Sequence, residues 1–174
     1  MLVAVTGTPG TGKTSACEVL RRKGRDVRDV AGLALERKAV SGRSAGELVV
    51  DVEKLADAID DVRATDPFAI VEGHLSHHLR PDVCVVLRCS PKVLRPRLAA
   101  RGYSEKKIRD NLEAEAIDLI LVESLDACRR TYEIDATRKK PERVAGDISK
   151  IIAGKIDGFQ PGLVDWSAEV LSWY

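Results

Sequence analysis

The segment of this chain best suited to chemistry is Gly7–Thr14, which matches the pattern G-x-x-x-x-G-K-[S/T] at every fixed position. Glycines let a backbone wrap closely around a phosphate, and the N–H groups of such a loop attract negative charge without help from side chains. Lys13 can reach the β- and γ-phosphates of a nucleoside triphosphate, and the Thr14 hydroxyl can bind Mg²⁺. The spacing therefore predicts a site for a nucleoside triphosphate and Mg²⁺.

A phosphate loop of this kind works with a carboxylate on a neighbouring strand, which holds the metal, usually through water. Glu72 follows the apolar run 68–71 and should lie at the carboxyl end of that strand, the edge where α/β proteins bind ligands. Asp82 precedes the apolar run 83–87 and should lie at the opposite edge. We therefore predict that Glu72 is the metal carboxylate, with a plain surface acid as the alternative.

The three histidines of the chain, His74, His77 and His78, lie within five residues. A transition-metal site is one interpretation, but no cysteine or acid other than Glu72 shares the cluster at ligand spacing. We favour a position beside the phosphates for His74, where it orients water or supports the loop. We interpret His77 and His78 as ordinary loop residues.

Five strand-like runs alternate with helical patterns, which is typical of an α/β fold with a parallel sheet flanked by helices. The strand-like runs are 2–5, 26–30, 68–71, 83–87 and 132–135. Helices are expected at 13–23, from Val52 to about residue 65, from Pro91 with a kink at Pro96, from Ser104 to about Arg129, and from Pro141.

Two segments are less regular. Residues 32–40 are compatible with a helix, and the composition of residues 41–46 is typical of a flexible loop. Residues 154–174 form a tail, which we expect to be helical because Trp166, Val170 and Trp173 recur at helical spacing.

Length and composition exclude several classes of protein. The 174 residues suit one domain, and 44% hydrophobic with 32% charged residues can build a core. A formal net charge of +1 argues against a surface that coats nucleic acid, so no sequence-specific nucleic-acid binding is expected. No membrane-spanning run and no secretory signal is visible. The four cysteines form no C-x-x-C pair, which favours buried thiols in a reduced, cytoplasmic compartment.

The small net charge is the sum of two segments of opposite sign. Residues 92–113 carry seven basic and three acidic side chains, a net charge of +4, whereas residues 47–66 carry two basic and seven acidic ones, a net charge of −5. The basic segment suits contact with phosphates and the acidic segment suits a basic protein. For each segment, a solvated helix face is the alternative.

Four stretches together resemble a known family. They are the phosphate loop, Val71-Glu72-Gly73-His74, Val86-Leu87-Arg88, and Arg101-Gly102-Tyr103-Ser104-Glu105-Lys106-Lys107-Ile108-Arg109-Asp110-Asn111. With these stretches the chain is similar to adenylate kinase isoenzyme 6, also known as the coilin-interacting nuclear ATPase family, which has archaeal members. The resemblance covers about residues 1–153, and the run 101–111 is its most specific part.

The resemblance implies a P-loop NTPase fold like that of the nucleoside monophosphate kinases, with a five-stranded parallel sheet in residues 1–153. It implies a monophosphate-binding segment at about 30–52 and a lid at about 101–111. The residues implied to bind ATP are Gly10, Gly12, Lys13, Thr14, Ser15 and Arg101. The family's D-x-H motif corresponds here to Glu72-x-His74, so the implied catalytic set is Lys13, Glu72, His74 and Arg101.

Two further positions are candidates for nucleotide contacts. Arg37 and Arg43 lie in the segment 30–52 and are candidates for holding the acceptor's phosphate. Arg138, in the basic run 137–140 after the last strand, lies where the adenine of ATP is expected in this fold.

The resemblance implies an ATP-dependent nucleoside monophosphate kinase, ATP + AMP = 2 ADP, that also has ATPase activity. It further implies a role in maturation of the small ribosomal subunit and rRNA processing, through a platform ribosomal protein. Two alternatives stay open: an assembly ATPase acting mainly on that ribosomal protein, and a small-metabolite kinase of the shikimate type. The guanine signature N-K-x-D is absent, which argues against a GTPase.

Overall fold

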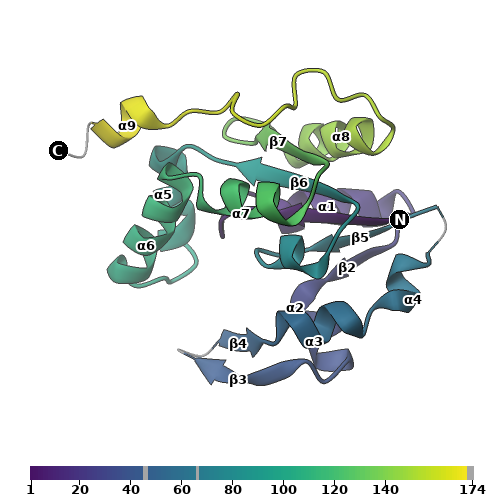
Figure 1. The fold of residues 1–174 in the computed structure, drawn as a ribbon. Helices are drawn as coiled ribbons and strands as arrows, with labels where there is room; N and C mark the ends of the chain where they lie inside the picture. The colour runs from purple at the N-terminus through teal and green to yellow at the C-terminus, as the bar shows by residue number, and fades with distance from the viewer. Residues whose placement is uncertain (45–46, 66, 172–174) are drawn as a thin grey trace.

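A parallel sheet of five strands forms the centre of the computed structural model, which describes residues 1–44, 47–65 and 67–171 (Figure 1). The strands are β1 (Leu2–Thr6), β2 (Val27–Asp29), β5 (Ala69–Glu72), β6 (Val83–Arg88) and β7 (Thr131–Asp135). Their order is β2-β5-β1-β6-β7, and every neighbouring pair is parallel. This arrangement confirms the predicted fold class. After β5 the chain crosses from one side of β1 to β6 on the other side, and open α/β sheets bind ligands at the carboxyl ends of the strands where such a change of side occurs.

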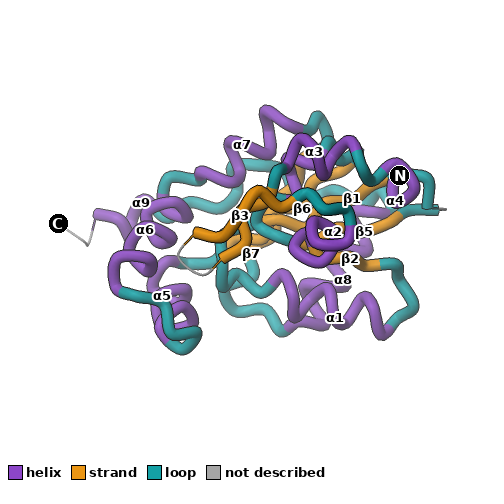
Figure 2. The backbone as a smooth tube through the Cα atoms, turned by 90° about the horizontal axis from the view of Figure 1, so that it is seen from below, coloured by secondary structure: helices purple, strands orange, loops and turns teal. Residues whose placement is uncertain are grey.

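Helices cover both faces of the sheet (Figure 2), which fits the complete burial of the three central strands β5, β1 and β6. On one face, α1 (Lys13–Arg22) and α8 (Pro141–Ile152) pack on Val3 and Val5. On the other face, Leu2 packs with residues of α2 (Val30–Glu36), α3 (Val52–Asp57) and α4 (Asp60–Arg63), and Ala4 with residues of α7 (Leu119–Ala127). Successive residues of β1 thus point to opposite faces, and the core has three layers: helices, sheet and helices.

The segment about 30–52 consists of α2 and a β-hairpin. The hairpin pairs β3 (Val40–Ser44) with β4 (Glu47–Val50) in antiparallel register, Val40 opposite Val50 and Arg43 opposite Leu48. The predicted loop is wrong for residues 41–44, and residues 45–46 lie outside the described part of the chain. The helix predicted for 32–40 ends at Glu36, because the chain then turns at Lys38 with a φ of 55° and enters β3.

Two long predicted helices are each broken in two. The helix expected from Val52 divides into α3 and α4 around Ala58 and Ile59. The helix expected from Ser104 to Arg129 divides into α6 (Glu105–Ala116) and α7, because Asp118 adopts a left-handed conformation with a φ of 59°. Its carboxylate pairs with the buried Arg88 of β6. Helix α5 (Pro91–Ala99) includes Pro96 without ending there and packs on α6 at one end of the sheet (Figure 1).

The tail lies along β7 and then reaches α5. Phe159 accepts a hydrogen bond from the Glu133 backbone N–H, and the N–H groups of Leu163 and Val164 donate to the Glu133 carboxylate at 2.6 and 2.9 Å. Within 154–171 the helical part is α9 (Ser167–Leu171), so the predicted helical pattern describes the end of the tail and not its start. Trp173 lies outside the described residues.

All four cysteines are buried and free of disulfides, and burial raises the pKa of Cys17 and Cys84 to about 12. None of the described helices is long and apolar enough to cross a membrane.

Candidate active site

The phosphate loop connects β1 to α1 and depends on glycine for its shape. Gly7 has a φ of 131°, and a Cβ there would lie 2.3 Å from the carbonyl oxygen of Leu87 on β6. At Gly10 the φ is 93°, and a Cβ would lie 2.7 Å from Leu94 Cδ1. Larger residues at these positions would displace the neighbouring chain, so the glycines allow the loop to lie directly on β6 and α5.

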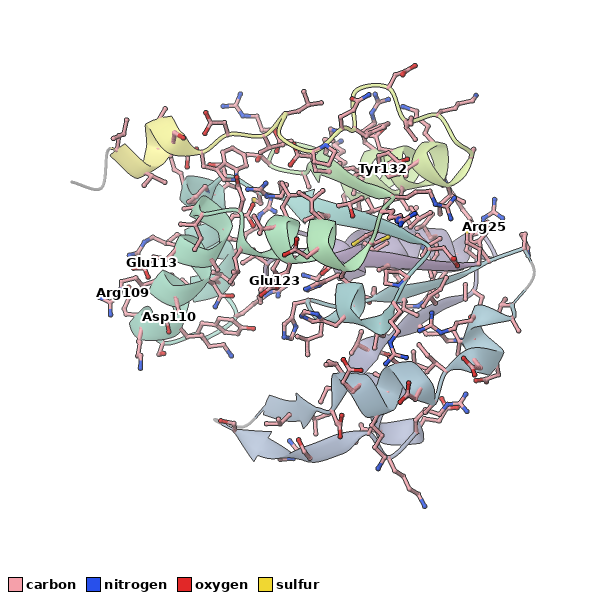
Figure 3. All side chains as sticks on the ribbon, in the orientation of Figure 1. Arg25, Arg109, Asp110, Glu113, Glu123 and Tyr132 are labelled. Atoms are coloured by element: carbon pink, nitrogen blue, oxygen red, sulfur yellow. The ribbon has the colours of Figure 1, made fainter. Side chains whose placement is uncertain are left out.

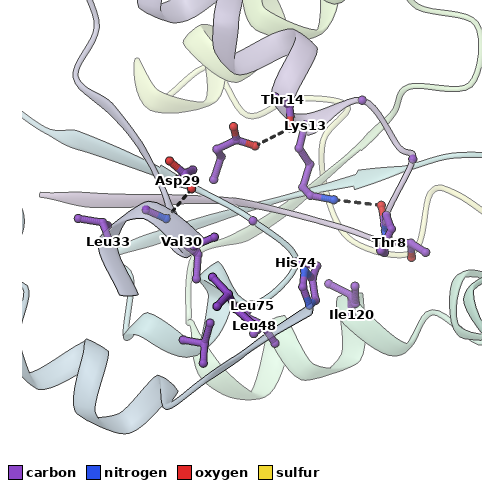
Figure 4. Close-up of a pocket in the computed structure, with 18 of the residues that line it drawn as sticks. Thr8, Lys13, Thr14, Asp29, Val30, Leu33, Leu48, His74, Leu75 and Ile120 are labelled. Atoms are coloured by element: carbon purple, nitrogen blue, oxygen red, sulfur yellow. Dashed lines mark hydrogen bonds between the residues drawn. The ribbon is translucent and has the colours of Figure 1, made fainter. Parts of the chain in front are cut away.

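Lys13 is buried inside this loop. Its Nζ donates to the carbonyl oxygen of Gly7 at 2.6 Å and to that of Thr8 at 3.0 Å, and Figure 4 marks the bond to Thr8. Burial lowers the pKa of Lys13 to about 8; Glu72 opposes this shift and Arg101 adds to it. An anion in the loop would offset the unfavourable burial of the ammonium group, so the electrostatics of the loop suit a phosphate.

Thr14 and Glu72 come together beside Lys13. The Thr14 hydroxyl donates to Glu72 Oε2 at 3.1 Å, and Arg21 Nη2 lies 3.5 Å from Glu72 Oε1. A hydroxyl and a carboxylate are the hard oxygen ligands that Mg²⁺ prefers, so these two side chains fit the predicted metal position. Asp82 lies at the opposite edge of the sheet, as expected, where its Oδ2 accepts from the N–H of Leu2 at 2.7 Å.

A cavity of about 1250 Å³ opens in front of the phosphate loop. One wall is formed by α2 and the hairpin, through Leu33, Leu48 and Val50, and the other by the turn and helix 101–111. His74 and Leu75 form part of the floor, and Figure 4 shows His74 facing the same cavity as Lys13 and Thr8. The cavity therefore brings together the phosphate loop, Glu72, the segment 30–52 and the segment 101–111, which are far apart in the sequence.

Most of the residues predicted for the site line this cavity. They are Gly10, Gly12, Lys13, Thr14, Glu72, His74 and Arg101. Ser15, Arg37, Arg43 and Arg138 are not among the lining residues. Arg37, just after α2, instead pairs with Asp61 of α4 at 2.6 Å, and Arg43 lies on the exposed strand β3.

Several lining residues were not predicted from the sequence. Arg21, Arg28 and Lys107 add positive charge to the cavity wall, and Tyr103 and Asn111 complete its lid side. Arg21 and Arg28 belong to α1 and β2, elements that were predicted correctly. The helical periodicity of α1 could have placed Arg21, and the position of Arg28 near the carboxyl end of β2 could have placed it beside the site.

A buried acid, Glu115 of α6, is hydrogen-bonded to the phosphate loop. Its carboxylate accepts from the Thr8 hydroxyl at 2.6 Å, from Arg88 Nε at 2.9 Å, from the Cys89 N–H at 3.0 Å and from Trp166 Nε1 at 3.2 Å. Sequence reasoning missed it, although it continues the apolar stripe of Ile108 and Leu112 in α6. An acid at a helix position that should face the core was the available signal.

His77 is buried as well, unlike the loop residue that was predicted. Its Nδ1 lies 3.0 Å from Thr6 Oγ1, and its Nε2 lies 3.1 Å from Glu123 Oε2 on α7. Burial, reinforced by the neighbouring His78, lowers the pKa of His77 to about 4. The acid that the sequence did not show near the histidines is thus supplied by a helix distant in the chain.

Comparison with known proteins agrees with this geometry. Residues 3–118 match the family model described as "AAA domain". A protein of Archaeoglobus fulgidus named "Putative adenylate kinase" is 47% identical over 173 residues, which covers 98% of this chain and 94% of that protein. The chain belongs to this adenylate-kinase-like family. Members in Thermococcus kodakarensis and Methanocaldococcus jannaschii are 40% and 37% identical, over 96% and 99% of this chain and 93% and 97% of theirs. The adenylate-kinase-like match therefore extends into the tail, beyond the 1–153 of the motif resemblance.

Solved structures share the fold of this adenylate-kinase-like chain at low sequence identity. A shikimate kinase from Acinetobacter baumannii, solved with shikimate, has a TM-score of 0.58 at 17% identity over 88% of this chain and 93% of its own. The YorR protein of Bacillus subtilis, solved with phosphorylated GDP, has a TM-score of 0.59 at 17% identity over 88% of this chain and 96% of its own. At this identity the likeness shows the fold alone.

Proposed function

We propose that this member of the adenylate-kinase-like family is an ATP-dependent nucleoside monophosphate kinase of the isoenzyme 6 type, with AMP as acceptor: ATP + AMP = 2 ADP. The cavity carries the proposal. A typical site for one small ligand measures about 300–1,000 Å³, whereas this one reaches about 1250 Å³ with a phosphate loop on one side and an independent apolar wall on the other. It has room for a donor and an acceptor in one space.

On the donor side, the loop N–H groups and Lys13 hold the β- and γ-phosphates. The carbonyl oxygens of Gly7 and Thr8 already position the Lys13 ammonium group inside the loop. Thr14 and Glu72 would hold Mg²⁺, which neutralises phosphate charge when bound. Arg101 and Lys107 bring positive charge from the lid. Phosphoryl transfer needs positioning and charge stabilisation more than covalent chemistry, and these groups supply both.

On the acceptor side, Leu33, Leu48 and Val50 offer an apolar surface to a nucleobase. Arg28, at the end of β2, is the cation of this wall that can meet the acceptor's phosphate. Arg43 would approach the acceptor when the hairpin closes over it. Arg138 would contact adenine from the loop after β7.

A panel of acceptors tests the proposal. Purified protein with ATP and Mg²⁺ is offered AMP, CMP, GMP and shikimate, and ADP or the phosphorylated product is measured. We expect AMP to be the best acceptor and shikimate to be inactive. Turnover of shikimate without turnover of any monophosphate would show a small-metabolite kinase and refute the proposal.

Substitution of Lys13 distinguishes turnover at this site from turnover by a contaminating kinase. Lys13→Ala should reduce turnover at least a thousandfold, because it removes the ammonium group that would stabilise the negative charge of the transferred phosphoryl group. Lys106→Ala is the matched control, since Lys106 is exposed at the start of α6 and does not line the cavity. Turnover by Lys13→Ala within tenfold of the unsubstituted protein would contradict the assignment.

We also propose that the protein hydrolyses ATP in the absence of an acceptor and binds a basic ribosomal protein during maturation of the small subunit. Helices α3 and α4, which carry most of the acidic side chains of the segment 47–66, support this second role, because Glu53 and Asp60 are largely exposed. Arg80 pairs with Glu53 and Asp57, so part of that negative charge is already balanced. Capture of ribosomal proteins from an archaeal lysate with and without ATP tests the role; retention of none under either condition would refute it.

A further inference from the structure

Three potential metal ligands meet where the 3₁₀ turn η1 (Ser76–Leu79) packs on α7. The ligand atoms of His77, His78 and Glu123 all lie within 4.8 Å of one another. Glu123 Oε2 is 3.1 Å from His77 Nε2 and 4.0 Å from His78 Nε2. Figure 3 shows Glu123 on the side of α7 that faces this turn. The group includes neither Thr14 nor Glu72, although Glu123 lines the same cavity as those two residues.

We propose that His77, His78 and Glu123 bind a divalent transition-metal ion, with zinc as the best match, and leave a fourth coordination position to solvent.

The ligand types favour this class of ion. Imidazole suits zinc and its neighbours in the first transition row, whereas Mg²⁺ takes oxygen ligands, so two histidines discriminate against the ion of the phosphate loop. Two imidazoles and one carboxylate are also a known three-ligand zinc set with an open position. In a tetrahedron with metal–ligand bonds of about 2.0–2.1 Å, ligand atoms are about 3.4 Å apart. Small side-chain rotations bring the present atoms to that spacing.

The surroundings of His77 support the same conclusion. Metal-bound histidines usually engage their second ring nitrogen in a hydrogen bond that fixes the orientation of the ring. Here His77 Nδ1 lies 3.0 Å from Thr6 Oγ1 in the buried end of β1. The Thr6 hydroxyl is also within 3.4 Å of the His74 carbonyl, to which it donates. It can therefore accept from the Nδ1–H tautomer of His77, which is the form that a metal requires, because Nε2 then carries a lone pair directed at the Glu123 carboxylate. Without a metal the other tautomer lets Nε2–H donate to that carboxylate, so metal binding replaces one hydrogen bond by two metal–ligand bonds.

The position is open to an ion from solution. The side chain of His77 is 1% exposed, but those of His78 and Glu123 are 37% and 40% exposed. The buried histidine thus provides a rigid ligand, and the two outer ligands can close on the ion. A bound metal would join η1 to α7 and so fix the segment 73–79, which carries His74 into the cavity.

Zinc titration of the full-length, EDTA-treated protein tests the site. Calorimetry is run without nucleotide and with millimolar Mg²⁺, so that the phosphate loop does not compete for zinc. We expect one Zn²⁺ per chain with a micromolar or tighter Kd. At hundredfold excess over Kd, the melting temperature should rise by roughly 5–10 °C. Co²⁺ should give the visible absorption bands of a four-coordinate site.

Glu123→Gln and His78→Ala should each weaken binding at least tenfold, and both positions are exposed enough to leave folding unchanged. His74→Ala and Glu113→Gln are the matched controls, a third histidine of the same segment and an exposed acid on α6, and should titrate like the unsubstituted protein. All variants keep the four cysteines. Equal affinity in Glu123→Gln and His78→Ala would therefore place the ion elsewhere and refute the proposal. Failure of the unsubstituted protein to bind a stoichiometric ion would refute it as well.

Discussion

Replacing Glu115 by glutamine should weaken the link between α6 and the phosphate loop. The carboxylate is buried and accepts four hydrogen bonds, from Thr8, Arg88, Cys89 and Trp166. Glutamine has nearly the same shape but no charge, and its amide group turns a donor towards one of these four donors. The substitution therefore tests the charge of the network with little change in volume.

The loss can be worked from the bonds. A hydrogen bond to a charged group contributes about 1.5–3 kcal/mol and a neutral one about 0.5–1.5 kcal/mol, so four bonds lose about 1 kcal/mol each. Arg88 keeps Glu133 at 3.2 Å and Asp118 as partners. Relief of repulsion among the three acids around one guanidinium offsets part of the loss. We expect Glu115→Gln to lower the free energy of unfolding by about 2–4 kcal/mol.

Urea unfolding followed by tryptophan fluorescence measures this quantity. For a chain of this length each kcal/mol corresponds to about 2–4 °C, so a thermal scan should show a fall of roughly 4–16 °C. Glu113→Gln is the control, because Glu113 projects into solvent from the same helix (Figure 3) and should change stability by less than about 0.5 kcal/mol. If the two variants differ by less than about 1 kcal/mol, the carboxylate does not stabilise the fold as argued.

Three further results are expected. The value of kcat/KM for ATP should fall as pH rises above about 8, because the pKa of Lys13 in the free protein lies there and its proton is needed to bind phosphate; in kcat this limb should move to higher pH, and a flat profile from pH 7 to 9.5 would contradict the role. Glu72→Gln should raise the Mg²⁺ concentration needed for half-maximal activity about 10- to 100-fold, since Thr14 keeps its bond but the metal loses an anionic partner; an unchanged Mg²⁺ dependence would remove Glu72 from the metal site. Trp166→Phe should cost about 1 kcal/mol in urea unfolding, because it removes the indole donor to Glu115 and keeps most of the ring; an unchanged midpoint would show that this contact does not dock the tail.

Features encoded within a short stretch of sequence were predictable. The three central strands β5, β1 and β6 are buried along their whole length, so each contains a continuous apolar run that can be recognised without knowing its partners. The phosphate loop is equally local, because its shape follows from glycines at three positions between a strand and a helix. Glu72 could be placed because carboxyl ends of parallel strands meet at one edge of a sheet.

The hairpin at 40–50 and the break after α6 were not predictable in this way. Ser41, Gly42 and Arg43 are typical of a loop, and they form a strand because they pair with 47–50 across the turn. No glycine or proline marks residue 118. The helix ends there because Asp118 turns to meet Arg88, 30 residues earlier in the chain. Such contacts between distant residues override local propensity.

The same distance separates the partners in the parts of the site that were missed. Glu115 meets Thr8 across 107 residues, and Glu123 meets His77 across 46. A helical stripe shows that Glu115 faces inward, but not which donors it finds there. Ligand spacing along the chain likewise shows two adjacent histidines but not the carboxylate that a separate helix brings to them.

The tail acquires a role from these long-range contacts. Helices α5 and α6 pack on each other through Leu94, Leu98, Ile108 and Leu112, so any movement of the predicted lid 101–111 should carry both helices with it. The tail contacts that body at both ends: Glu169 accepts from Ser90 and from the Lys92 N–H at the start of α5, and Trp166 donates to Glu115 near the end of α6. Because Glu115 also binds Thr8 of the phosphate loop, a lid movement that preserves these bonds must pivot about them. The tail is thus linked through Glu115 to the phosphate loop and through Glu169 to the start of α5, so its removal should loosen the contact between α5, α6 and the loop.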